Sequence, residues 1–503
     1  MEYIVKPWAH QLKAIEKAAF LANFGLFFDP GTGKTGTTIN ILRGKFNDNR
    51  RILRTLIFCP PIVIKNWKDE WHMHSKIDQD KVILLTGSSQ DRVKRFKQYA
   101  WDKEGKPTGR VFVTNYEALL MLELFKSFLA WQPEAVVADE SHKIKDYSAK
   151  RTKKLLELSG PEYKYKPNSK EKELIRPEPK HKFILTGTPV LNTPMDLFTQ
   201  FLFMDGGKTF GDSFYIFRAT YFHDKNAGMP KAKYFPDWKP IPQMLDIMAK
   251  KIANSAMSAK KSDCLDLPPF VPKKISLGMS PAQSKMYEEM KRDFITFMET
   301  EGREPSPVTA QLAITKALRL MQITSGFVRD TQGEDHQLPA TPKLEALREL
   351  LSDLAPHHKV IVWAVWKENY AQIKALCREL GFRFVEVTGD TPAGKRFENV
   401  DRFNNDPDVR VFIGHPGSGG IGINLVASDI AIFYSRTFSL EHSLQAEARN
   451  YRGGSEIHQS VTRYDLVCSE TIDEAVQKRL EQKLEIGHSV LKELAAEMKS
   501  GLS

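Results

Sequence analysis

Short apolar runs alternate with amphipathic stretches along the first part of the chain. The runs are LFF just before GTGKT, RTLIFCP at Arg54–Pro60, KVILLTG at Lys81–Gly87, GRVFVTN at Gly109–Asn115, AVVADE ending at Glu140, and KFILTGTP at Lys182–Pro189. Strand patterns that alternate with helical patterns are typical of a sheet whose successive strands run parallel. The first part of the chain is therefore predicted to form a mostly parallel sheet covered by helices.

A second set of apolar runs follows after a long interval. Its members are KVIVWAVW at Lys359–Trp366, FRFVEVTG at Phe382–Gly389, VRVFIGHP at Val409–Pro416, DIAIFYS at Asp429–Ser435 and VTRYDLV at Val461–Val467. Between about Met204 and Thr341 aromatic, Lys-rich helical patterns replace the strand signal. The pattern predicts an α/β fold with two parallel-sheet lobes, residues 1–205 and 342–503, and a helical protrusion and linker over 206–341. The proline-rich, charged stretch Pro161–Lys182 is predicted to be an exposed loop.

The sequence GTGKT at Gly31–Thr35 stands between an apolar run and the helical pattern TTINIL. This strand, tight loop and helix order is what a phosphate-binding loop requires. Gly31, Thr32 and Gly33 would point backbone amides at phosphate oxygens, Lys34 would reach the β and γ phosphates, and the Thr35 hydroxyl would ligate Mg²⁺. Taken alone, the motif also fits a Gly-rich turn before a helix, because Phe28 occupies the place of the first glycine of the full pattern.

Two adjacent carboxylates end the apolar run AVVA, in the sequence DESH at Asp139–His142. A carboxylate at the end of a buried strand can hold the Mg²⁺ ion, and its neighbour can orient the attacking water. We assign Asp139 to the metal and Glu140 to the water. The two motifs together indicate an NTPase site.

Composition agrees with a large enzyme that acts inside the cell. A chain of 503 residues is expected to form two or three domains, and it carries 73 basic and 62 acidic residues for a formal net charge of +11. The positive charge suits a polyanionic partner but is weak evidence alone. No apolar run approaches the ~20 residues of a membrane span, and MEYIVKPWAH has no signal-peptide core, so no membrane partner and a cytoplasmic location are expected. The four scattered cysteines indicate neither a zinc site nor a disulfide framework.

Two arginines in QAEARNYRGGS are candidates for a contribution from the second lobe. Only the first lobe carries a phosphate loop, so the nucleotide is expected to lie in a cleft that the second lobe completes. Arg449 and Arg452 are three residues apart, which would place both on one face of a helix. They would then act as arginine fingers on the γ-phosphate. The alternative is a solvated helix with surface arginines.

The order of these motifs resembles the Swi/Snf family (sucrose non-fermenting type two) of helicase superfamily two, in a compact form like those of prokaryotes and viruses. The resemblance covers nearly the whole chain, through KPWAHQLKAI, GTGKT, LIFCPPIVIKNWKDEW, VTNYEAL, DESHKIKD, LTGTPVLN, SPAQSKMYEEM, ALRLMQITSG, GSGGIGINL and QAEARNYR. It implies two RecA-like lobes and an ATP-hydrolysing motor with Mg²⁺ as cofactor.

The resemblance also implies roles for residues of the first lobe that lie outside the phosphate loop. Gln11 would read the adenine, which makes ATP the expected nucleotide. His142 would link the hydrolytic carboxylates to the segment that contains Thr186, Gly187 and Thr188. Outside the family context, Gln11 fits a helix-surface amide and His142 a plain hydrogen-bonding residue.

In the second lobe the resemblance implies that Gly419, Gly420, Gly422 and Asn424 bring the backbone close to a nucleic-acid strand and to the edge of the cleft. The glycines alone would also fit a flexible turn. Three departures from the family pattern are present: the first concerns the fine geometry of the loop, and the other two concern the coupling surface of the second lobe. Phe28 precedes the phosphate loop, TFSLEHSL replaces the usual Trp-Asn-Pro, and the final motif reads RGGS.

The resulting interpretation is a DNA-stimulated ATPase that moves along double-stranded DNA, grips its backbone independently of sequence, and acts in repair, recombination or replication. We expect it in the cytoplasm of a prokaryotic cell or of a virus-infected host cell. The alternatives are a strand-separating DNA or RNA helicase, a nucleotide-gated DNA-binding module without productive hydrolysis, and the motor subunit of a nuclease assembly.

Overall fold

The computed structural model describes residues 2–165, 172–229, 236–300, 307–330, 332–338, 341–417 and 423–499. The chain divides into two compact units. Unit 1 comprises Met1–His223, Pro240–Leu265 and Glu485–Ser503, and unit 2 comprises Asp224–Lys239 and Asp266–Leu484. The three-part division at residues 205 and 341 stays a prediction.

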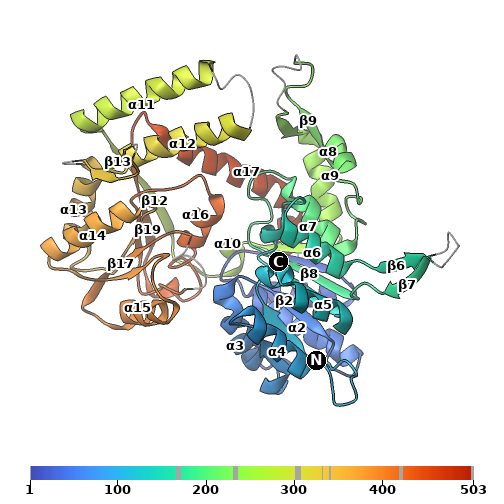
Figure 1. Ribbon diagram of the computed structural model, residues 1–503. Helices are drawn as coiled ribbons and strands as arrows, with labels where there is room; N and C mark the ends of the chain where they lie inside the picture. The colour runs from blue at the N-terminus through green and yellow to red at the C-terminus, as the bar shows by residue number, and fades with distance from the viewer. Residues whose placement is uncertain are drawn as a thin grey trace. The chain divides into compact units, whose positions relative to one another are not determined.

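Unit 1 is built on a parallel sheet of seven strands among the described residues, in the order β11-β1-β8-β5-β2-β4-β3. The strands are β1 (Phe24–Phe28), β2 (Thr55–Phe58), β3 (Val82–Leu84), β4 (Val111–Thr114), β5 (Ala135–Asp139), β8 (His181–Leu185) and β11 (Ala256–Ala259). All except β11 coincide with apolar runs predicted as strands. Figure 1 shows helices on both faces of this sheet.

Both faces of the unit 1 sheet are buried, and successive side chains alternate between them. Phe24, Leu26 and Phe28 of β1 share one hydrophobic core with residues of the first three helices, whereas Phe27 packs against Phe201 on the opposite face. The helices are α1 (Ala9–Ala19), α2 (Lys34–Asp48), α3 (Ile64–His74), α4 (Ser89–Ala100), α5 (Leu122–Trp131), α6 (Lys150–Ser159), α7 (Asp196–Asp205), α8 (Phe214–Tyr221), α9 (Pro242–Ala253) and α10 (Lys261–Cys264). Short 3-10 turns are η1 (Pro61–Val63), η2 (Gln79–Lys81), η3 (Tyr116–Leu120) and η4 (Ser141–Ile144).

Strand β11 lies in the stretch that was predicted to be helical. It pairs in parallel with β1, and Gly25 stands opposite Ala256. A Cβ atom on Gly25 would lie 3.0 Å from the Ala256 Cβ, so the glycine permits a close approach of the two strands. The first sheet is therefore completed by a segment far along the chain.

Unit 2 contains a parallel sheet of six strands among the described residues, in the order β12-β19-β18-β15-β17-β16. The strands are β12 (Phe270–Leu277), β15 (Val360–Trp363), β16 (Arg383–Val387), β17 (Val409–Gly414), β18 (Ile430–Phe433) and β19 (Val461–Cys468). The predicted fold class of two parallel-sheet lobes is thus confirmed.

Two separate cores cover the faces of the unit 2 sheet. Val360 and Val362 of β15 pack with α13 and α14, whereas Ile361 and Trp363 pack with α15 and α16. The helices are α11 (Pro281–Thr300), α12 (Pro307–Thr324), α13 (Pro342–Leu354), α14 (Lys367–Glu379), α15 (Ala393–Asn405), α16 (Leu440–Glu447) and the first part of α17 (Ile472–Lys499), with the 3-10 turn η6 (Ser455–Ile457). The part of α17 from Glu485 onward belongs to unit 1. Strand β12, also within the stretch predicted as helical, adds an edge to this sheet along the whole length of β19.

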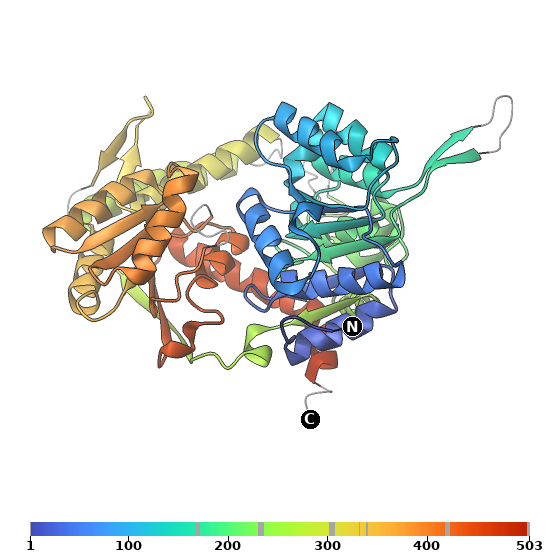
Figure 2. The same ribbon diagram turned by 90° about the horizontal axis from the view of Figure 1, so that it is seen from below.

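The stretch predicted as an exposed loop is partly a hairpin. Strands β6 (Glu162–Tyr165) and β7 (Lys172–Arg176) pair antiparallel, and Figures 1 and 2 show the hairpin projecting from the body of unit 1. Its base is fixed by buried Arg176, whose guanidinium donates to the carbonyls of Glu157 and Leu158 at the end of α6.

Two further strand pairs are short. Strands β9 (Phe222–Asp224) and β10 (Trp238–Pro240) form one pair, and β13 (Phe327–Arg329) and β14 (Asp335–Gln337) form the other. Within the described residues, no helix combines the length and the apolar character that a membrane crossing requires.

Candidate nucleotide-binding and hydrolytic site

The phosphate loop connects β1 to α2, as predicted. Gly31 and Gly33 have φ angles of +91° and +80°, in the left-handed region that favours glycine, and Gly33 is the N-cap of α2. The Thr32 hydroxyl donates to the Asp29 carbonyl at 2.8 Å, which stabilises the turn, and Thr35 is the second residue of the helix. Because the N-terminus of α2 presents free amides, this loop is suited to bind an anion.

Lys34 is held at the start of α2. Its ammonium donates to the Phe28 carbonyl at 2.9 Å, so the side chain folds back over the loop. Phe28 is fully buried and is the last residue of β1. The departure from glycine at this position therefore concerns a strand residue whose side chain belongs to the hydrophobic core.

Gln11 lies against the phosphate loop rather than on a free helix surface. Its amide donates to the Thr32 carbonyl at 3.3 Å and accepts from the Trp8 amide at 2.9 Å. A Cβ atom on Gly33 would come within 2.0 Å of the Gln11 Nε2 atom, so this glycine makes room for the glutamine. The predicted nucleotide residues Gln11 and Gly31–Thr35 are thus brought together.

His10 is a loop contact that the sequence analysis missed. Its Nε2 atom lies 2.8 Å from the Thr32 carbonyl and therefore carries the proton. The buried ring lies between the Trp8 and Phe28 rings, with centroid distances of 5.7 and 5.4 Å. Burial lowers the pKa of His10, which keeps the imidazole neutral in its role as a donor. Trp8 remains about half exposed beside the loop.

Asp139 ends β5 as a buried carboxylate with a donor on each oxygen. The Trp67 indole donates to Oδ2 at 2.9 Å, and the Glu140 amide donates to Oδ1 at 2.9 Å. Burial, and next the neighbouring Glu140 charge, raise the pKa of Asp139 to about 6. Trp67, nearby Lys34 and the Glu140 amide act in the opposite direction. A bound cation would stabilise the charged form of this carboxylate further.

Glu140 adopts a left-handed backbone with φ of +50°, which turns the chain sharply after β5. Its Oε2 atom accepts from the Thr186 hydroxyl at 3.4 Å and lies 3.4 Å from His142 Nδ1. His142 Nδ1 lies 3.1 Å from the Thr186 hydroxyl oxygen, which also accepts from the Thr188 amide at 3.0 Å. The structure thus joins Glu140, His142, Thr186 and Thr188 in one hydrogen-bonded group, as the family resemblance implied.

Gly187 packs directly against the strand that feeds the phosphate loop. A Cβ atom at Gly187 would lie 2.8 Å from a ring carbon of Pro30 and 3.1 Å from the Phe28 carbonyl. The carbonyl that holds Lys34 is therefore in contact with the Thr186–Thr188 segment. Through this contact the segment adjoins both the phosphate loop and the carboxylates.

The candidate residues of the second lobe are placed differently from the sequence prediction. Helix α16 ends at Glu447, so Arg449 and Arg452 lie in the turns after it and do not share a helical face. Arg449 is buried and donates to the carbonyls of Gln445 and Ile423. Arg452 is half-buried, whereas Asn424 is exposed and its carbonyl accepts from Asn404.

The prediction of a shared helical face was wrong because it required the helix to continue past Glu447. The three glycines predicted to contact nucleic acid, Gly419, Gly420 and Gly422, lie outside the described residues.

The donor set of unit 1 fits a Mg²⁺–nucleotide. The glycine amides and the Lys34 ammonium are phosphate donors, and the Thr35 hydroxyl and the Asp139 carboxylate are oxygen ligands of the kind that Mg²⁺ takes. The space that a Cβ at Gly33 would fill is taken by the Gln11 side chain, which keeps the glutamine beside the loop. These residues come from separate segments that the fold assembles at one end of the parallel strands.

Comparison with protein families agrees with this arrangement. The SNF2-related domain matches residues 21–325, more than half of the chain, and the helicase conserved C-terminal domain matches residues 342–454. The chain belongs to the SNF2-related family. The family resemblance found in the sequence is thereby confirmed.

Relatives of this SNF2-related chain are distant in sequence. TATA-binding protein-associated factor BTAF1 of Arabidopsis thaliana is 23% identical over 98% of this chain and 26% of that protein. Chromodomain-helicase-DNA-binding protein 1-like of Mus musculus is 24% identical over 92% of this chain and 47% of that protein. The chain therefore spans about a quarter to a half of the length of these relatives. A Sulfolobus solfataricus SWI2/SNF2 ATPase core solved in complex with dsDNA is 20% identical, with a TM-score of 0.42, over 97% of this chain and 93% of that chain.

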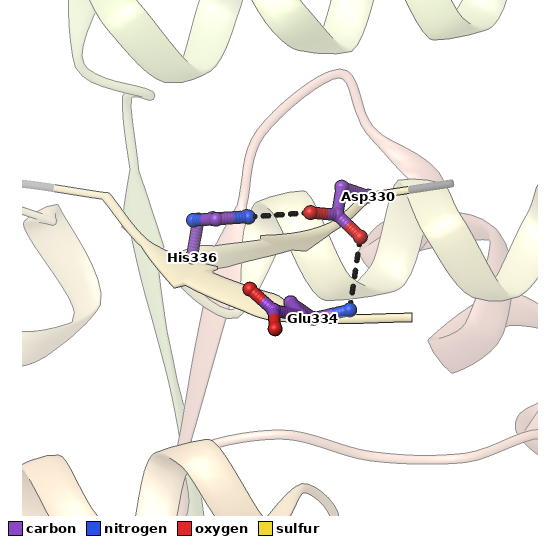
Figure 3. A group of neighbouring side chains, drawn as sticks. All are labelled: Asp330, Glu334 and His336. Carbon is purple, nitrogen blue, oxygen red and sulfur yellow. Dashed lines mark hydrogen bonds and ion pairs between the residues drawn. The ribbon is translucent and has the colours of Figure 1, made fainter. Parts of the chain in front are cut away.

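A second cluster of residues of metal-binding types lies at a turn of the SNF2-related chain, and the hydrogen bonds of that turn account for the cluster. Asp330, Glu334 and His336 offer ligand atoms within 4.8 Å of one another, at the β13–β14 hairpin (Figure 3). Asp330 Oδ1, however, accepts from the amides of Gln332 and Glu334, and Oδ2 lies 2.8 Å from His336 Nε2. Asp330 therefore closes the hairpin turn in the manner usual for aspartate.

Proposed function

We propose that the chain is an ATP-dependent motor that acts on double-stranded DNA. The observation that carries the proposal is the assembly in unit 1 of a phosphate loop, a buried strand-end carboxylate and a second carboxylate bonded to a separate segment. Family membership and the net charge of +11 support it. One relative, the Mus musculus protein, is named as a helicase and DNA-binding protein.

In the proposed reaction, each residue of unit 1 has a defined task. Gln11 recognises the base, and Lys34 with the loop amides holds the phosphates. Thr35 and Asp139 hold Mg²⁺, which supplies charge neutralisation at the phosphates when it is bound. Glu140 orients the attacking water and accepts its proton.

The contacts of Glu140 give a route from hydrolysis to the rest of unit 1. Its carboxylate shares Thr186 with His142, and the next residue, Gly187, packs beside the Phe28 carbonyl that accepts from Lys34. A change in the charge or position of the phosphates would act on Lys34 and Glu140 together. We therefore assign Thr186, Gly187 and Thr188 to coupling, with His142 as the residue that orients Thr186.

For the second lobe, we propose that Arg449 and Arg452 act on the phosphates, and that Asn424 contributes to the DNA-binding surface, as the family resemblance implies. The two arginines are not equivalent, because Arg449 donates to two carbonyls within unit 2 and would have to release them to reach a phosphate. Substituting Arg449 would disturb packing, so Arg452 is the cleaner residue to test.

The decisive experiment compares steady-state ATP hydrolysis with double-stranded DNA, single-stranded DNA, RNA and forked DNA at one salt concentration. We expect the largest stimulation with duplex DNA. Lys34→Ala should abolish hydrolysis, whereas the control Lys65→Ala, at an exposed residue of α3, should not. A chain that hydrolyses no ATP with any of these nucleic acids would refute the motor.

A second assay decides what the motor does to the duplex. Displacement of a triplex-forming strand and unwinding of a fork are measured side by side in the same buffer. We expect the third strand to be displaced while the duplex remains paired. Efficient fork unwinding without triplex displacement would replace the translocase with a strand-separating helicase.

A further inference from the structure

Two aromatic side chains hold Asp139 in place from opposite ends of the residue. The indole N–H of Trp67, on α3, donates to the carboxylate Oδ2 at 2.9 Å. The hydroxyl of Tyr116, on η3, donates to the main-chain carbonyl of Asp139 at 2.7 Å. All three residues are buried, and the two aromatic residues come from the segments that follow β2 and β4.

We propose that Trp67 and Tyr116 are positioning residues for the metal-binding carboxylate, and we name the pair the Asp139 clamp. The inference rests on the proposed function and deepens it, because it assigns to these side chains the geometry of the Mg²⁺ ligand. Outer partners that orient a ligating group commonly change metal affinity when they are removed.

Trp67, together with the Glu140 amide, restricts the carboxylate, because the two donors occupy one lone pair on each of its oxygens. With Trp67 on Oδ2 and the Glu140 amide on Oδ1, rotation of the carboxylate would break two hydrogen bonds inside a buried site. Each oxygen keeps another lone pair for a cation or its water. The Tyr116 hydroxyl also fixes the backbone, by its hydrogen bond to the Asp139 carbonyl just before Glu140 turns the chain.

Trp71 provides a comparison for Trp67, because burial in the core does not by itself give an indole nitrogen a hydrogen-bond partner. Both tryptophans lie on α3, one turn apart, and both are fully buried. The Trp71 ring stacks on Phe46 at a centroid distance of 6.0 Å, and its indole nitrogen has no hydrogen-bond partner among the described residues. Of these two equally buried tryptophans, Trp67 donates to the carboxylate, whereas Trp71 contributes to core packing.

The test is Mn²⁺ binding to the full chain loaded with a non-hydrolysable ATP analogue, measured by electron paramagnetic resonance. Trp67→Phe removes the indole N–H, and Trp71→Phe is the matched loss of a buried ring. We expect Trp67→Phe to weaken Mn²⁺ binding by about 10-fold to 100-fold, and Trp71→Phe by less than about twofold. The half-saturating Mg²⁺ concentration for hydrolysis should rise in parallel in Trp67→Phe, whereas the maximal rate at high Mg²⁺ should recover.

Equal Mn²⁺ affinities for the two variants would overturn the clamp. Thermal melting reports whether each variant folds, and if Trp67→Phe does not, Tyr116→Phe carries the test, since it removes a single hydroxyl. Mn²⁺ binding unchanged in Tyr116→Phe would then overturn the proposal, and weakened binding would support it. If the wild-type chain binds neither the nucleotide nor Mn²⁺, the proposed function itself fails, and the clamp fails with it.

Discussion

Replacing Glu140 by glutamine should separate catalysis from stability. The carboxylate makes two long contacts, of 3.4 Å each, to Thr186 and His142, and its side chain is 23% exposed. Contacts of this length and exposure contribute at most about 1 kcal/mol to the free energy of unfolding. Glutamine has the same shape, keeps an acceptor oxygen for Thr186, and is no worse suited to the left-handed backbone. The folded state should therefore be almost unchanged.

Catalysis should respond far more strongly, because glutamine cannot accept the proton of the attacking water. Loss of a general base typically slows the reaction by about 10²-fold to 10⁴-fold, equivalent to about 3 to 5 kcal/mol of activation free energy. The assay is DNA-stimulated ATP hydrolysis, run with fluorescent-nucleotide binding and chemical denaturation on the same preparation. Glu117→Gln, at an exposed residue of η3, is the control and should behave as wild type. Turnover of Glu140→Gln within tenfold of wild type, or loss of its nucleotide binding, would show that Glu140 has another role.

Other substitutions and conditions test separate parts of the structure. Gly33→Ala should abolish nucleotide binding, because its Cβ would overlap the Gln11 amide at 2.0 Å and its φ is +80°; titration with a fluorescent nucleotide checks this. Arg452→Ala should lower stimulated hydrolysis at least tenfold with little change in nucleotide affinity, and a smaller loss would identify a surface arginine. Burial, and next His442, lower the pKa of His415 to about 4, so stability should fall as the pH drops from 6.5 to 4. His415→Asn should remove that pH dependence in denaturation experiments. DNA affinity should fall with salt with a log–log slope of about −4 to −7, the same for unrelated sequences, as measured by fluorescence anisotropy.

The strands of both sheets could be predicted wherever a run of large apolar residues is buried on both faces. Strand β11 could not, because three of the four residues of Ala256–Ala259 have small side chains and the strand depends on pairing with β1 across Gly25. Strand β12 could not be predicted either, since it contains Pro272 and two lysines. Those residues are tolerated at the edge of a sheet, where one side of the strand makes no ladder hydrogen bonds. Both strands are set by partners distant in the chain, which a local pattern does not contain.

The candidate phosphate-binding and Mg²⁺-binding residues of unit 1 were identified from the sequence, because the types and the order of such residues follow from the chemistry of phosphate and Mg²⁺. Those that position them were not. In the sequence, His10 and Trp67 cannot be told apart from ordinary core residues. Only the fold shows that their N–H groups donate to Thr32 and Asp139. Trp67 and Trp71 stand in the same sequence, NWKDEW, with equal apolar character, so no local signal distinguishes the positioning residue from the packing one.

The place of β11 determines how the first unit can be cut from the chain. A fragment that stops where the strand signal fades, near Asp205, would keep the phosphate loop and the carboxylates but lose Ala256–Ala259. The β1 strand, whose residues Phe24–Phe28 are all buried, would then have an open edge of unpaired amides and carbonyls beside apolar side chains. Such an edge invites pairing between molecules, so this fragment should aggregate. The Asp29 amide donates to the Ala259 carbonyl, and the Asp29 carboxylate accepts from the Lys261 amide, so the phosphate loop would lose its anchor as well. A soluble fragment with an intact loop must retain Pro240–Leu265.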